Sequence, residues 1–262
     1  MQIWTTGSKG LVGRHLVRRL MSSDHRIIGT DLVNDVRSLN LKSFIYDADL
    51  IINLAALNSS KESIENPRAY FETNVVGNFN MLEIAKAIGA KYMYLTSPKA
   101  RELNPYGVSK KSAEDWIMSY KETYKMPIVI NRVGNLYGEG GDNFWVNIFM
   151  KKSKNNETIE VWGDQSRDML YIEDLVTLLV DQINNFDLYA SQGVIPCGGG
   201  SENIISTKGL VEWLKYDNVT YKDALGTLEE SRVTDNTLVT SINGWKPTTG
   251  LEEGLKKTYE SI

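Results

Sequence analysis

Three side chains near the middle of the sequence have the chemistry of an acid–base site. Tyr106 and Lys110 are four residues apart, so a helix would place them on one face. A tyrosine with an unperturbed pKa of ~10 is a poor base at neutral pH. A neighbouring ammonium group favours the phenolate and lowers that pKa. Ser97 follows a predicted strand and can bond a substrate hydroxyl, so the three residues predict proton removal from an alcohol.

A glycine-rich turn early in the chain has the form of a phosphate-binding site. Gly7, Gly10 and Gly13 lie between a predicted strand and a predicted helix. This spacing permits a tight turn and close approach of the backbone to a diphosphate, which the helix N-terminus then attracts. Asp31 ends the next predicted strand, where a carboxylate bonds the ribose hydroxyls of NAD and repels the 2′-phosphate of NADP. The sequence therefore predicts NAD as the cofactor.

The elements that must position these residues alternate between short apolar strands and longer helices. Strands are expected at residues 2–6, 26–30, 50–54, 91–96 and 127–132, and helices at 11–21, 67–88 and 105–124. Asn66 and Pro67 supply an N-cap and a first helical position for the second helix. Apolar strands separated by helices indicate a parallel sheet covered on both faces. We expect a doubly wound α/β domain of the Rossmann type.

The pattern changes after Arg132. Residues 134–142 are typical of a loop, and helices are expected near 143–153, 173–184, 207–216 and 251–259 among short strands. We expect a second, smaller α/β lobe that binds the substrate. The expected division assigns residues 1–135 and 168–197 to the NAD-binding domain, and residues 136–167 and 198–262 to the substrate-binding lobe.

Composition narrows the class of protein. The 262 residues include 29 Lys plus Arg and 33 Asp plus Glu, and the net charge of −4 offers no general attraction for nucleic acid. No apolar stretch is long enough to span a bilayer, so no membrane partner is expected. The single cysteine, Cys197, favours the reducing cytoplasm. The only histidines, His15 and His25, are expected at the surface, which leaves no metal site and no Ser–His–Asp triad.

The motifs together resemble those of the extended short-chain dehydrogenase/reductase family, the NAD-dependent epimerases and dehydratases of nucleotide sugars. Residues 6–13 are similar to the family's T-G-x-x-G-x-x-G turn, and residues 53–56 and 74–77 to its H/N-L-A-A and N-V-x-G segments. Residues 132–138 resemble R-x-x-N-x-Y-G, and residues 163–174 resemble G-D-x-x-R-D-x-x-x-V-x-D. The C-terminal residues 244–255 are similar to G-W-x-P followed by L-x-x-G-L. The resemblance extends through nearly the whole chain.

The resemblance implies a role for each matching residue. The implied catalytic residues are Ser97, Tyr106 and Lys110. The implied NAD contacts are Gly7, Lys9, Gly10, Leu11, Val12, Gly13, Asp31, Asp35, Val36, Ala55, Ala56, Asn74, Tyr106 and Lys110, with Asp35 and Val36 at the adenine. Asn135 and Arg167 would hold the diphosphate of a nucleotide-sugar substrate. Purely structural roles remain open for Asn74 in ordering the helix backbone, for Arg167 in an ion pair, and for Asp174 at a helix start.

The residues after Ser97 bear on the reaction. Members of this family that remove water or carbon dioxide carry carboxylates there, whereas this chain has Pro98 and Lys99. Members that invert C3 and C5 rely on cysteine and histidine, and no histidine follows His25. We therefore expect C4 epimerisation, by transient oxidation and return of the hydride. An NAD-dependent sugar dehydrogenase or 4-keto-reductase, and a regulatory protein that binds NAD without turnover, remain alternatives.

The chain is short for the family that it resembles. Only nine positions separate Ser97 from Tyr106, and the stretch from Asp31 to Asp47 is compressed. Both shortened stretches lie on the active-site side. The resemblance therefore says least about the residues that would bind the sugar. By analogy with the family, a homodimer is expected through the helices at 67–88 and 105–124.

Overall fold

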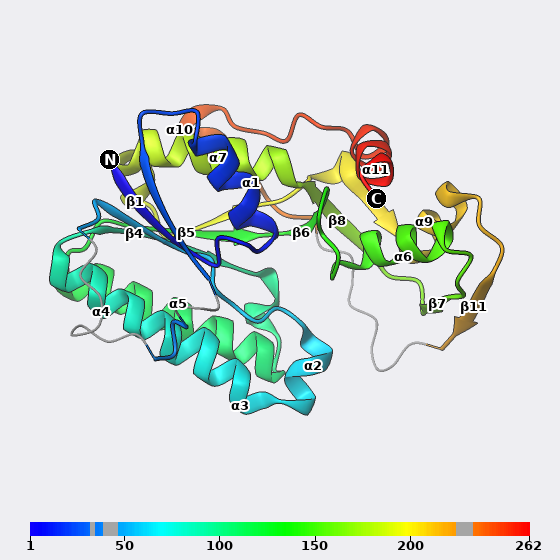
Figure 1. The fold of residues 1–262 in the computed structure, drawn as a ribbon, viewed down its shortest axis with the longest axis horizontal. Coiled ribbons are helices and arrows are strands. Elements are labelled where there is room, and N and C mark those ends of the chain that lie inside the picture. Colours follow the sequence, from blue (N-terminus) through cyan, green and yellow to red (C-terminus); the bar gives the residue numbers. More distant parts are fainter. Residues whose placement is uncertain (32–34, 39–46, 224–232) are drawn as a thin grey trace. The chain divides into compact units, whose positions relative to one another are not determined.

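The computed structural model describes residues 1–31, 35–38, 47–223 and 233–262. The chain divides into two compact units (Figure 1). Unit 1 comprises Met1–Val133 and Leu178–Ile195, and unit 2 comprises Gly134–Thr177 and Pro196–Ile262. Part of the expected compressed stretch, residues 32–34 and 39–46, lies outside the described residues.

Unit 1 is built on a six-stranded sheet in the order β2-β1-β3-β4-β5-β9. Its strands are β1 (Gln2–Thr6), β2 (Arg26–Thr30), β3 (Leu50–Asn53), β4 (Lys91–Thr96), β5 (Ile128–Val133) and β9 (Val194–Cys197). The pairings of β1 with β2 and β3, of β3 with β4 and of β4 with β5 are parallel. The chain order reverses between β1 and β3, and ligands of open α/β sheets bind at such a switch point, outside the carboxyl ends of the strands.

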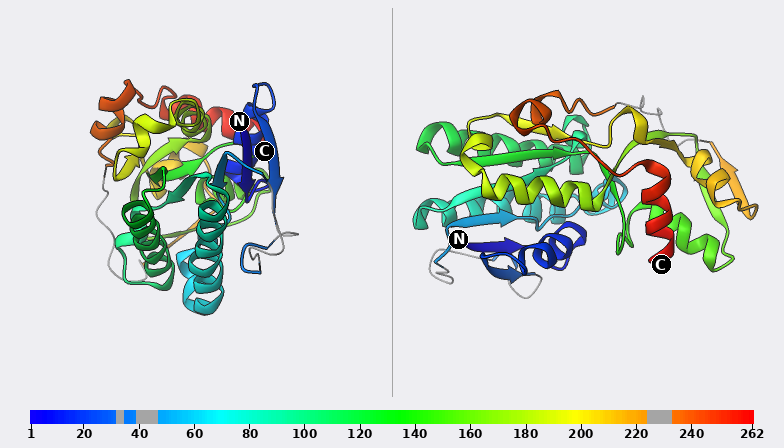
Figure 2. Two further views of the ribbon diagram at one scale, coloured as in Figure 1. Left: turned by 90° about the vertical axis from the view of Figure 1, so that its left-hand side faces the viewer. Right: turned by 90° about the horizontal axis from the view of Figure 1, so that it is seen from above.

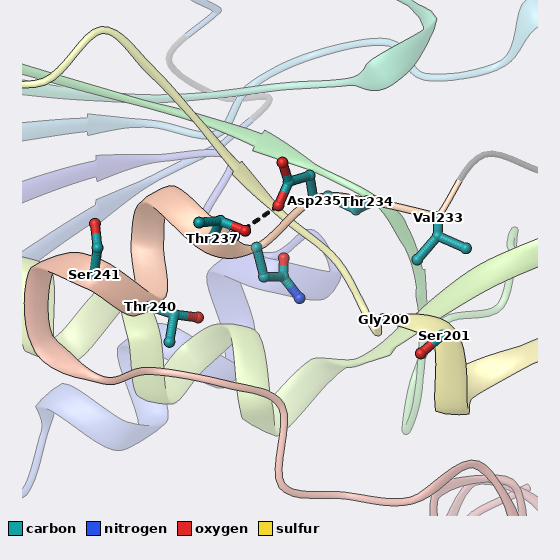
Figure 3. Close-up of a pocket in the computed structure, with 9 residues that line it drawn as sticks. Gly200, Ser201, Val233, Thr234, Asp235, Thr237, Thr240 and Ser241 are labelled. Carbon is teal, nitrogen blue, oxygen red and sulfur yellow. Dashed lines mark hydrogen bonds between the residues drawn. The ribbon is translucent and has the colours of Figure 1, made fainter.

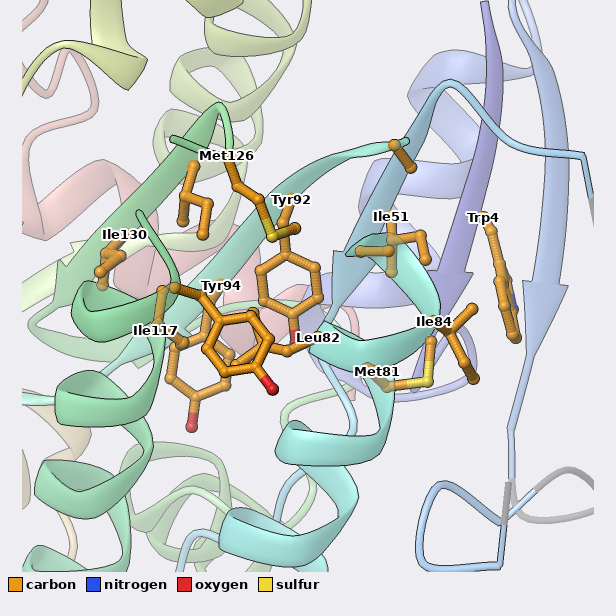
Figure 4. Close-up of a cluster of buried hydrophobic side chains, with 14 of the residues drawn as sticks. Trp4, Ile51, Met81, Leu82, Ile84, Tyr92, Tyr94, Ile117, Met126 and Ile130 are labelled. Atoms are coloured by element: carbon orange, nitrogen blue, oxygen red, sulfur yellow. The ribbon is translucent and has the colours of Figure 1, made fainter. Parts of the chain in front are cut away.

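Helices cover the sheet of unit 1. On one face, α4 (Asn78–Ile88) and α5 (Pro105–Tyr124) lie side by side (Figure 2) and bury a continuous apolar core against the strands (Figure 4). Strand residues such as Trp4, Ile51 and Tyr92 meet Leu82 and Ile117 of these helices in that core. The α1 helix (Leu11–Leu20) packs against β1 and β2. The doubly wound α/β fold is confirmed.

His15 corrects one expectation from the sequence. It is only 3% exposed, whereas a surface position was expected. His15 lies four residues after Leu11 and shares the buried side of α1 with it, because positions i and i+4 of a helix lie on one face.

The helical stretch expected at residues 67–88 is interrupted. After α2 (Ser60–Glu65), the chain forms α3 (Pro67–Tyr70), a seven-residue π-helix (η2, Phe71–Gly77) and then α4. Asn66 precedes α3 as expected, but its side chain makes no capping hydrogen bond. π-Helices are rare, and those that occur are often found at functional sites. This one includes Asn74, whose side chain is buried.

Unit 2 combines two small sheets with helices. One sheet has the order β10-β8-β6, and the other pairs β11 with β7. The strands are β6 (Asn135–Tyr137), β7 (Ile159–Trp162), β8 (Ser166–Tyr171), β10 (Ile204–Ser206) and β11 (Val219–Lys222), and the helices include α6 (Trp145–Lys154), α9 (Thr207–Leu214), α10 (Thr237–Asn243) and α11 (Leu251–Glu260). The α6 helix contacts both α9 and α11 (Figure 2). The segment expected as a loop at 134–142 contains β6, which pairs with β8.

The chain returns to unit 1 later than the expected boundary at residue 168. Residues 168–177 belong to unit 2, because β8 pairs with β6 and β10 there. Helix α7 (Ile172–Asn184) carries the chain back, and α8 (Phe186–Ala190) and the start of β9 complete unit 1. Among the described residues, no helix has both the length and the apolar character needed to cross a membrane.

Candidate active site

Two caps fix the segment that carries Ser97 and Tyr106. Ser97 leaves the carboxyl end of β4 and caps the short 3₁₀ helix Pro98–Arg101, its Oγ accepting a hydrogen bond from the Lys99 amide at 3.3 Å. Asn104 caps α5, its Oδ1 accepting from the Gly107 amide at 2.8 Å. Pro105 occupies the first helical position, so Tyr106 lies in the first turn of α5. The nine-position span between Ser97 and Tyr106 is thus filled by a single 3₁₀ turn and a cap.

The phenol of Tyr106 is buried next to Ser97. Burial raises the pKa of Tyr106 to about 12, and the Glu102 carboxylate adds to this rise, while a hydrogen bond with Ser97 opposes it. Tyr106 is 5% exposed, and its ring meets that of Tyr70 edge to face. In the protein without ligand, Tyr106 is therefore held as the neutral phenol and requires a nearby positive charge to act as a base.

Lys110 lies one helical turn after Tyr106 and is 4% exposed. Its Nζ donates to the Tyr94 hydroxyl and to the Leu95 carbonyl, both at 3.2 Å. Burial lowers the pKa of Lys110 to about 8, and Glu114 opposes the fall. Lys110 therefore keeps its positive charge at neutral pH and gives it up in mildly alkaline solution.

The side-chain amide of Asn74 binds two segments of the chain near Tyr106. Its Oδ1 accepts from the Leu57 amide at 2.9 Å, and its Nδ2 donates to the Leu57 carbonyl at 3.0 Å and to Ser109 Oγ at 2.9 Å. Ser109 in turn donates to the Tyr106 carbonyl at 2.7 Å. Both Nδ2 hydrogens thus have partners within the protein. The structure places Asn74 beside Tyr106 as a residue that orders the backbone.

The glycine turn has the shape that a diphosphate requires. Gly7 has a φ of +63°, and a Cβ on it would lie 2.7 Å from the Ala55 nitrogen. A Cβ on Gly13 would lie 2.2 Å from the Gly7 carbonyl oxygen. Gly10 is the N-cap of α1 and offers no side-chain cap, and the first turn contains no acidic residue. The amides at the start of this helix are therefore available to an anion, so these residues fit the diphosphate of NAD.

The predicted ribose partner lies beside this turn. Asp31 follows β2, and its Oδ2 accepts from the Lys9 amide at 2.8 Å. Ala55 and Ala56 follow β3, the neighbour of β1, and the Ala55 amide donates to Thr6 Oγ1 at 3.3 Å. The structure thus brings the glycine turn, Asp31 and the alanines to one end of the sheet. Leu11 is buried in the first turn of α1, and Val12 follows it half-buried.

The predicted adenine contacts are engaged within the protein. The Asp35 carboxylate binds the Arg37 guanidinium, which lowers the pKa of Asp35. Val36 is 4% exposed, and its side chain fills the space beside Gly77. Its carbonyl accepts from Asn80 Nδ2 at 2.9 Å.

The two predicted substrate residues belong to unit 2, on neighbouring strands of one sheet. Asn135 begins β6 and stands opposite Met169 of β8, and Arg167 lies two residues before Met169. Asn135 Nδ2 donates to the Asp168 carbonyl at 3.3 Å. The Arg167 guanidinium lies over the Trp145 ring, 5.3 Å from its centroid, and hydrogen bonds to Gln165. Asp174 holds the chain near Thr248 and Thr249, which supports its structural role.

A hollow in unit 2 is lined mainly by small polar side chains (Figure 3). Its volume is about 710 Å³, and its lining includes Ser201, Thr234, Thr237, Thr240 and Ser241. Asn236 fastens one side by pairing with both the amide and the carbonyl of Gly198. The sequence offered a signal for this feature in the polar run Thr-Asp-Asn-Thr at residues 234–237, which the motif analysis did not use.

A carboxylate one helical turn after Lys110 also escaped the sequence analysis. Glu114 is four residues after Lys110 and is 3% exposed, and it pairs with Arg132 of β5. Helical spacing from Lys110 was the signal for Glu114. In the part of the chain that the structure describes, no group of three or more His, Cys, Asp or Glu side chains could hold a metal ion.

Comparison with known proteins identifies the family of the chain. The model of the NAD-dependent epimerase/dehydratase family matches residues 3–198. A probable UDP-glucuronate 4-epimerase of Rhizobium meliloti is 30% identical, over 69% of this chain and 67% of that protein. A UDP-glucose 4-epimerase of Mycolicibacterium smegmatis is 27% identical, over 99% of this chain and 98% of its own.

The fold is also similar to that of solved structures. A crystal structure of UDP-glucuronic acid 4-epimerase from Bacillus cereus, in complex with UDP-glucuronic acid and NAD, superposes with a TM-score of 0.90. The superposition covers 100% of this chain and 98% of that one, at 20% identity. The chain therefore belongs to the NAD-dependent epimerase/dehydratase family and is an enzyme of that family with NAD as its cofactor.

Proposed function

We propose that this enzyme inverts C4 of a nucleotide-diphosphate sugar by transient oxidation. One observation carries the proposal: the buried phenol of Tyr106 lies beside Ser97, and the buried Lys110 lies one turn further along the same helix. The names of the relatives, UDP-glucuronate and UDP-glucose 4-epimerases, support a nucleotide sugar as the substrate class.

In this proposal, each residue has a distinct task. Ser97 Oγ bonds the C4 oxygen and holds the sugar in place. Tyr106 takes the proton from the C4 hydroxyl and returns it after the sugar has turned in the site. The Lys110 ammonium favours the Tyr106 phenolate, because opposite charges stabilise each other in a buried site. Bound NAD supplies the acceptor and donor of the hydride, and the glycine turn with Asp31 would hold it.

The proposal assigns NAD binding to unit 1 and binding of the substrate diphosphate to unit 2. Leu11, Val12, Ala55 and Ala56 would contact the cofactor together with the glycine turn. The Arg167 guanidinium suits the paired oxygens of a diphosphate, and Asn135 would donate to the same group.

A binding panel followed by product analysis tests the function. Thermal unfolding is measured with NAD and, in turn, with UDP-, GDP-, dTDP- and CDP-sugars, and each stabilising sugar is then incubated in D₂O with the enzyme. We expect the C4 epimer to form without deuterium at C4, because the same hydride returns to the carbon. Net accumulation of NADH would instead indicate a dehydrogenase, and no stabilisation by any sugar would favour the regulatory alternative.

We further propose that the enzyme is a cytoplasmic homodimer. The single cysteine leaves no internal disulfide, which suits a reducing compartment. Exposed apolar side chains gather on and before α5, namely Leu103, Val108 and Trp116, which are 100%, 52% and 44% exposed. Light scattering should give twice the monomer mass, and Leu103→Lys with Trp116→Lys should give the monomer. Ile64→Lys on α2, which is 67% exposed, is the matched control and should remain dimeric.

A further inference from the structure

A buried ion pair lies one helical turn beyond Lys110. Arg132 Nη2 donates to Glu114 Oε2 at 2.6 Å, and Arg132 Nε donates to Oε1 at 3.3 Å. The side chains of Glu114 and Arg132 are only 4% and 17% exposed. Moving two charges out of water offsets most of their attraction, so a buried pair is weak evidence of a role in stability alone.

The surroundings of Lys110 suggest what the pair does. Its two hydrogen-bond acceptors are the Tyr94 hydroxyl and a backbone carbonyl, and its Nζ lies 4.9 Å from the centroid of the Tyr94 ring. Burial raises the pKa of Tyr94 well above its usual value, so this phenol is neutral. Neither partner balances the charge of the ammonium group. Glu114 shares its helical face and is the carboxylate that acts on it.

We propose that the Glu114–Arg132 pair sets the charge state of Lys110, and through it the readiness of Tyr106 to ionise. Glu114 provides the negative field that keeps Lys110 protonated, and Arg132 weakens this field by binding both carboxylate oxygens. Lys110 thereby holds its charge near neutrality without being locked in an ion pair of its own. Both residues act through Lys110 as positioning residues, and their effect on turnover rests on the proposed function.

Among the described residues, the ionisable groups around the Tyr106–Lys110 turn of α5 include Tyr94 on β4, which contacts Lys110, and Tyr70 on α3 and Glu102 after the 3₁₀ helix, which act on Tyr106. Lys99 lies in the 3₁₀ helix itself. Lys99 and Glu102 pair with each other at 3.4 Å, and burial raises the pKa of each of the three tyrosines. At neutral pH, the uncompensated charge in this group is that of Lys110.

Two substitutions should move the titration of Lys110 in opposite directions. In Glu114→Gln, the negative field is lost and Arg132 remains, so the midpoint should fall by about one pH unit. In Arg132→Met, the full charge of Glu114 acts on Lys110, so the midpoint should rise by a similar amount. In the double variant, the midpoint of Lys110 should lie between those of the two single variants. The midpoint is followed by NMR on full-length protein with ¹³C-labelled lysine, with and without NAD, and Lys110 is assigned from the signal absent in Lys110→Met.

The controls separate electrostatics from damage to the fold. Glu83→Gln removes another carboxylate of the α4–α5 layer, one bound to Lys86 and Tyr120, and should leave the Lys110 midpoint unchanged. If either single variant fails to fold, Glu114→Asp and Arg132→Lys keep the charges and should restore the wild-type midpoint. Equal shifts in both single variants, or no shift in either, would overturn the proposal.

The Lys110 midpoint measured by NMR does not depend on whether the enzyme turns over a sugar. Opposite shifts of the Lys110 midpoint in a protein that epimerises no sugar would retain the role of the pair and reject the proposed function. In an active enzyme, the alkaline limb of the pH profile of kcat should move in the same direction as the midpoint in each variant.

Discussion

Asn74 and Ser109 are joined by a buried hydrogen bond of 2.9 Å between Nδ2 and Oγ. Through this bond, the π-helix holds the first turn of α5, because Ser109 also donates to the carbonyl of Tyr106. The same Asn74 amide binds the backbone of Leu57 beyond β3. The segment after β3, the π-helix and the start of α5 are therefore held together by one side chain.

We expect Asn74→Ala to lower the free energy of unfolding by about 2–3 kcal/mol, because three polar groups, one buried and two partly buried, lose their partner. Urea unfolding measures this loss. Asn80→Ala is the matched control, since Asn80 Nδ2 donates to the carbonyls of Val36 and Arg37. It should cost about 1 kcal/mol. Equal losses of unfolding free energy in the two variants would contradict the inference that Asn74 holds the three segments together.

Gly13→Ala should abolish NAD binding. An added Cβ would lie 2.2 Å from the Gly7 carbonyl oxygen, so the turn must open and its amides move away from the diphosphate site. Isothermal titration calorimetry should show at least about a hundredfold weaker binding, equivalent to about 2.7 kcal/mol. Gly193→Ala, where nothing lies within 4 Å of the added Cβ, should bind NAD as the wild type does.

Asp31→Ala should weaken the preference for NAD over NADP. Removing the carboxylate removes both an acceptor for the ribose hydroxyls and the repulsion of a 2′-phosphate. The dissociation constant for NAD should rise while that for NADP falls, and calorimetry with both cofactors measures the two changes. An unchanged ratio of the two constants would place the ribose elsewhere. Asp49→Ala, which removes a carboxylate bound to the Gln2 amide, serves as the control.

The periodicity of the sequence predicted the first half of the fold closely. The strands at residues 2–6, 26–30 and 91–96 and the helix at 105–124 have the predicted bounds. Most of these elements bury apolar residues in one core, and α5 carries strong start signals in Asn104 and Pro105. The motif residues around the glycine turn and Tyr106 follow these elements, so their clustering was also predictable.

The remainder depends on contacts that sequence patterns do not encode. The π-helix is indistinguishable from an α-helix by apolar spacing. Its Asn74 bonds residues 17 and 35 positions away, which apolar spacing does not reveal. Similarly, β6 is three residues long and is defined by its pairing with β8, more than 30 positions later in the chain. The burial of Glu114 depends on Arg132 of another element.

Tyr106→Phe should retain NAD but lose turnover by a factor of about 10²–10⁴, which is typical for removal of an acid–base group. The aromatic ring remains as a phenyl group, so its edge contact with Tyr70 and the fold should persist. NAD is quantified after denaturation of the purified variant, and turnover is measured on the sugar found in the binding panel. Tyr124→Phe, on an exposed turn of the same helix, should be as active as the wild type. Full activity of Tyr106→Phe would remove Tyr106 from the mechanism.

Lys110→Met should stabilise the cofactor-free protein at pH 7 while abolishing turnover. The pKa of Lys110 is lowered to about 8 in the folded protein, from 10.5. Below pH 8, the buried charge therefore costs about 3 kcal/mol of stability. Between pH 8 and 10.5, the unfolded chain retains the proton that the folded protein has lost, so the stability of the wild type rises with pH. Above 10.5, both states are neutral and the cost is gone.

Methionine fills similar space without a charge, so the variant lacks this rise. Urea unfolding of both proteins between pH 7 and 10 should show the variant ahead by about 3 kcal/mol at pH 7 and the difference shrinking with pH. Lys111→Met, at an exposed neighbour paired with Asp115, should show no such convergence. If the difference in the free energy of unfolding stays constant from pH 7 to 10, burial does not lower the pKa of Lys110. The role argued for Lys110 in ionising Tyr106 would then lose its electrostatic basis.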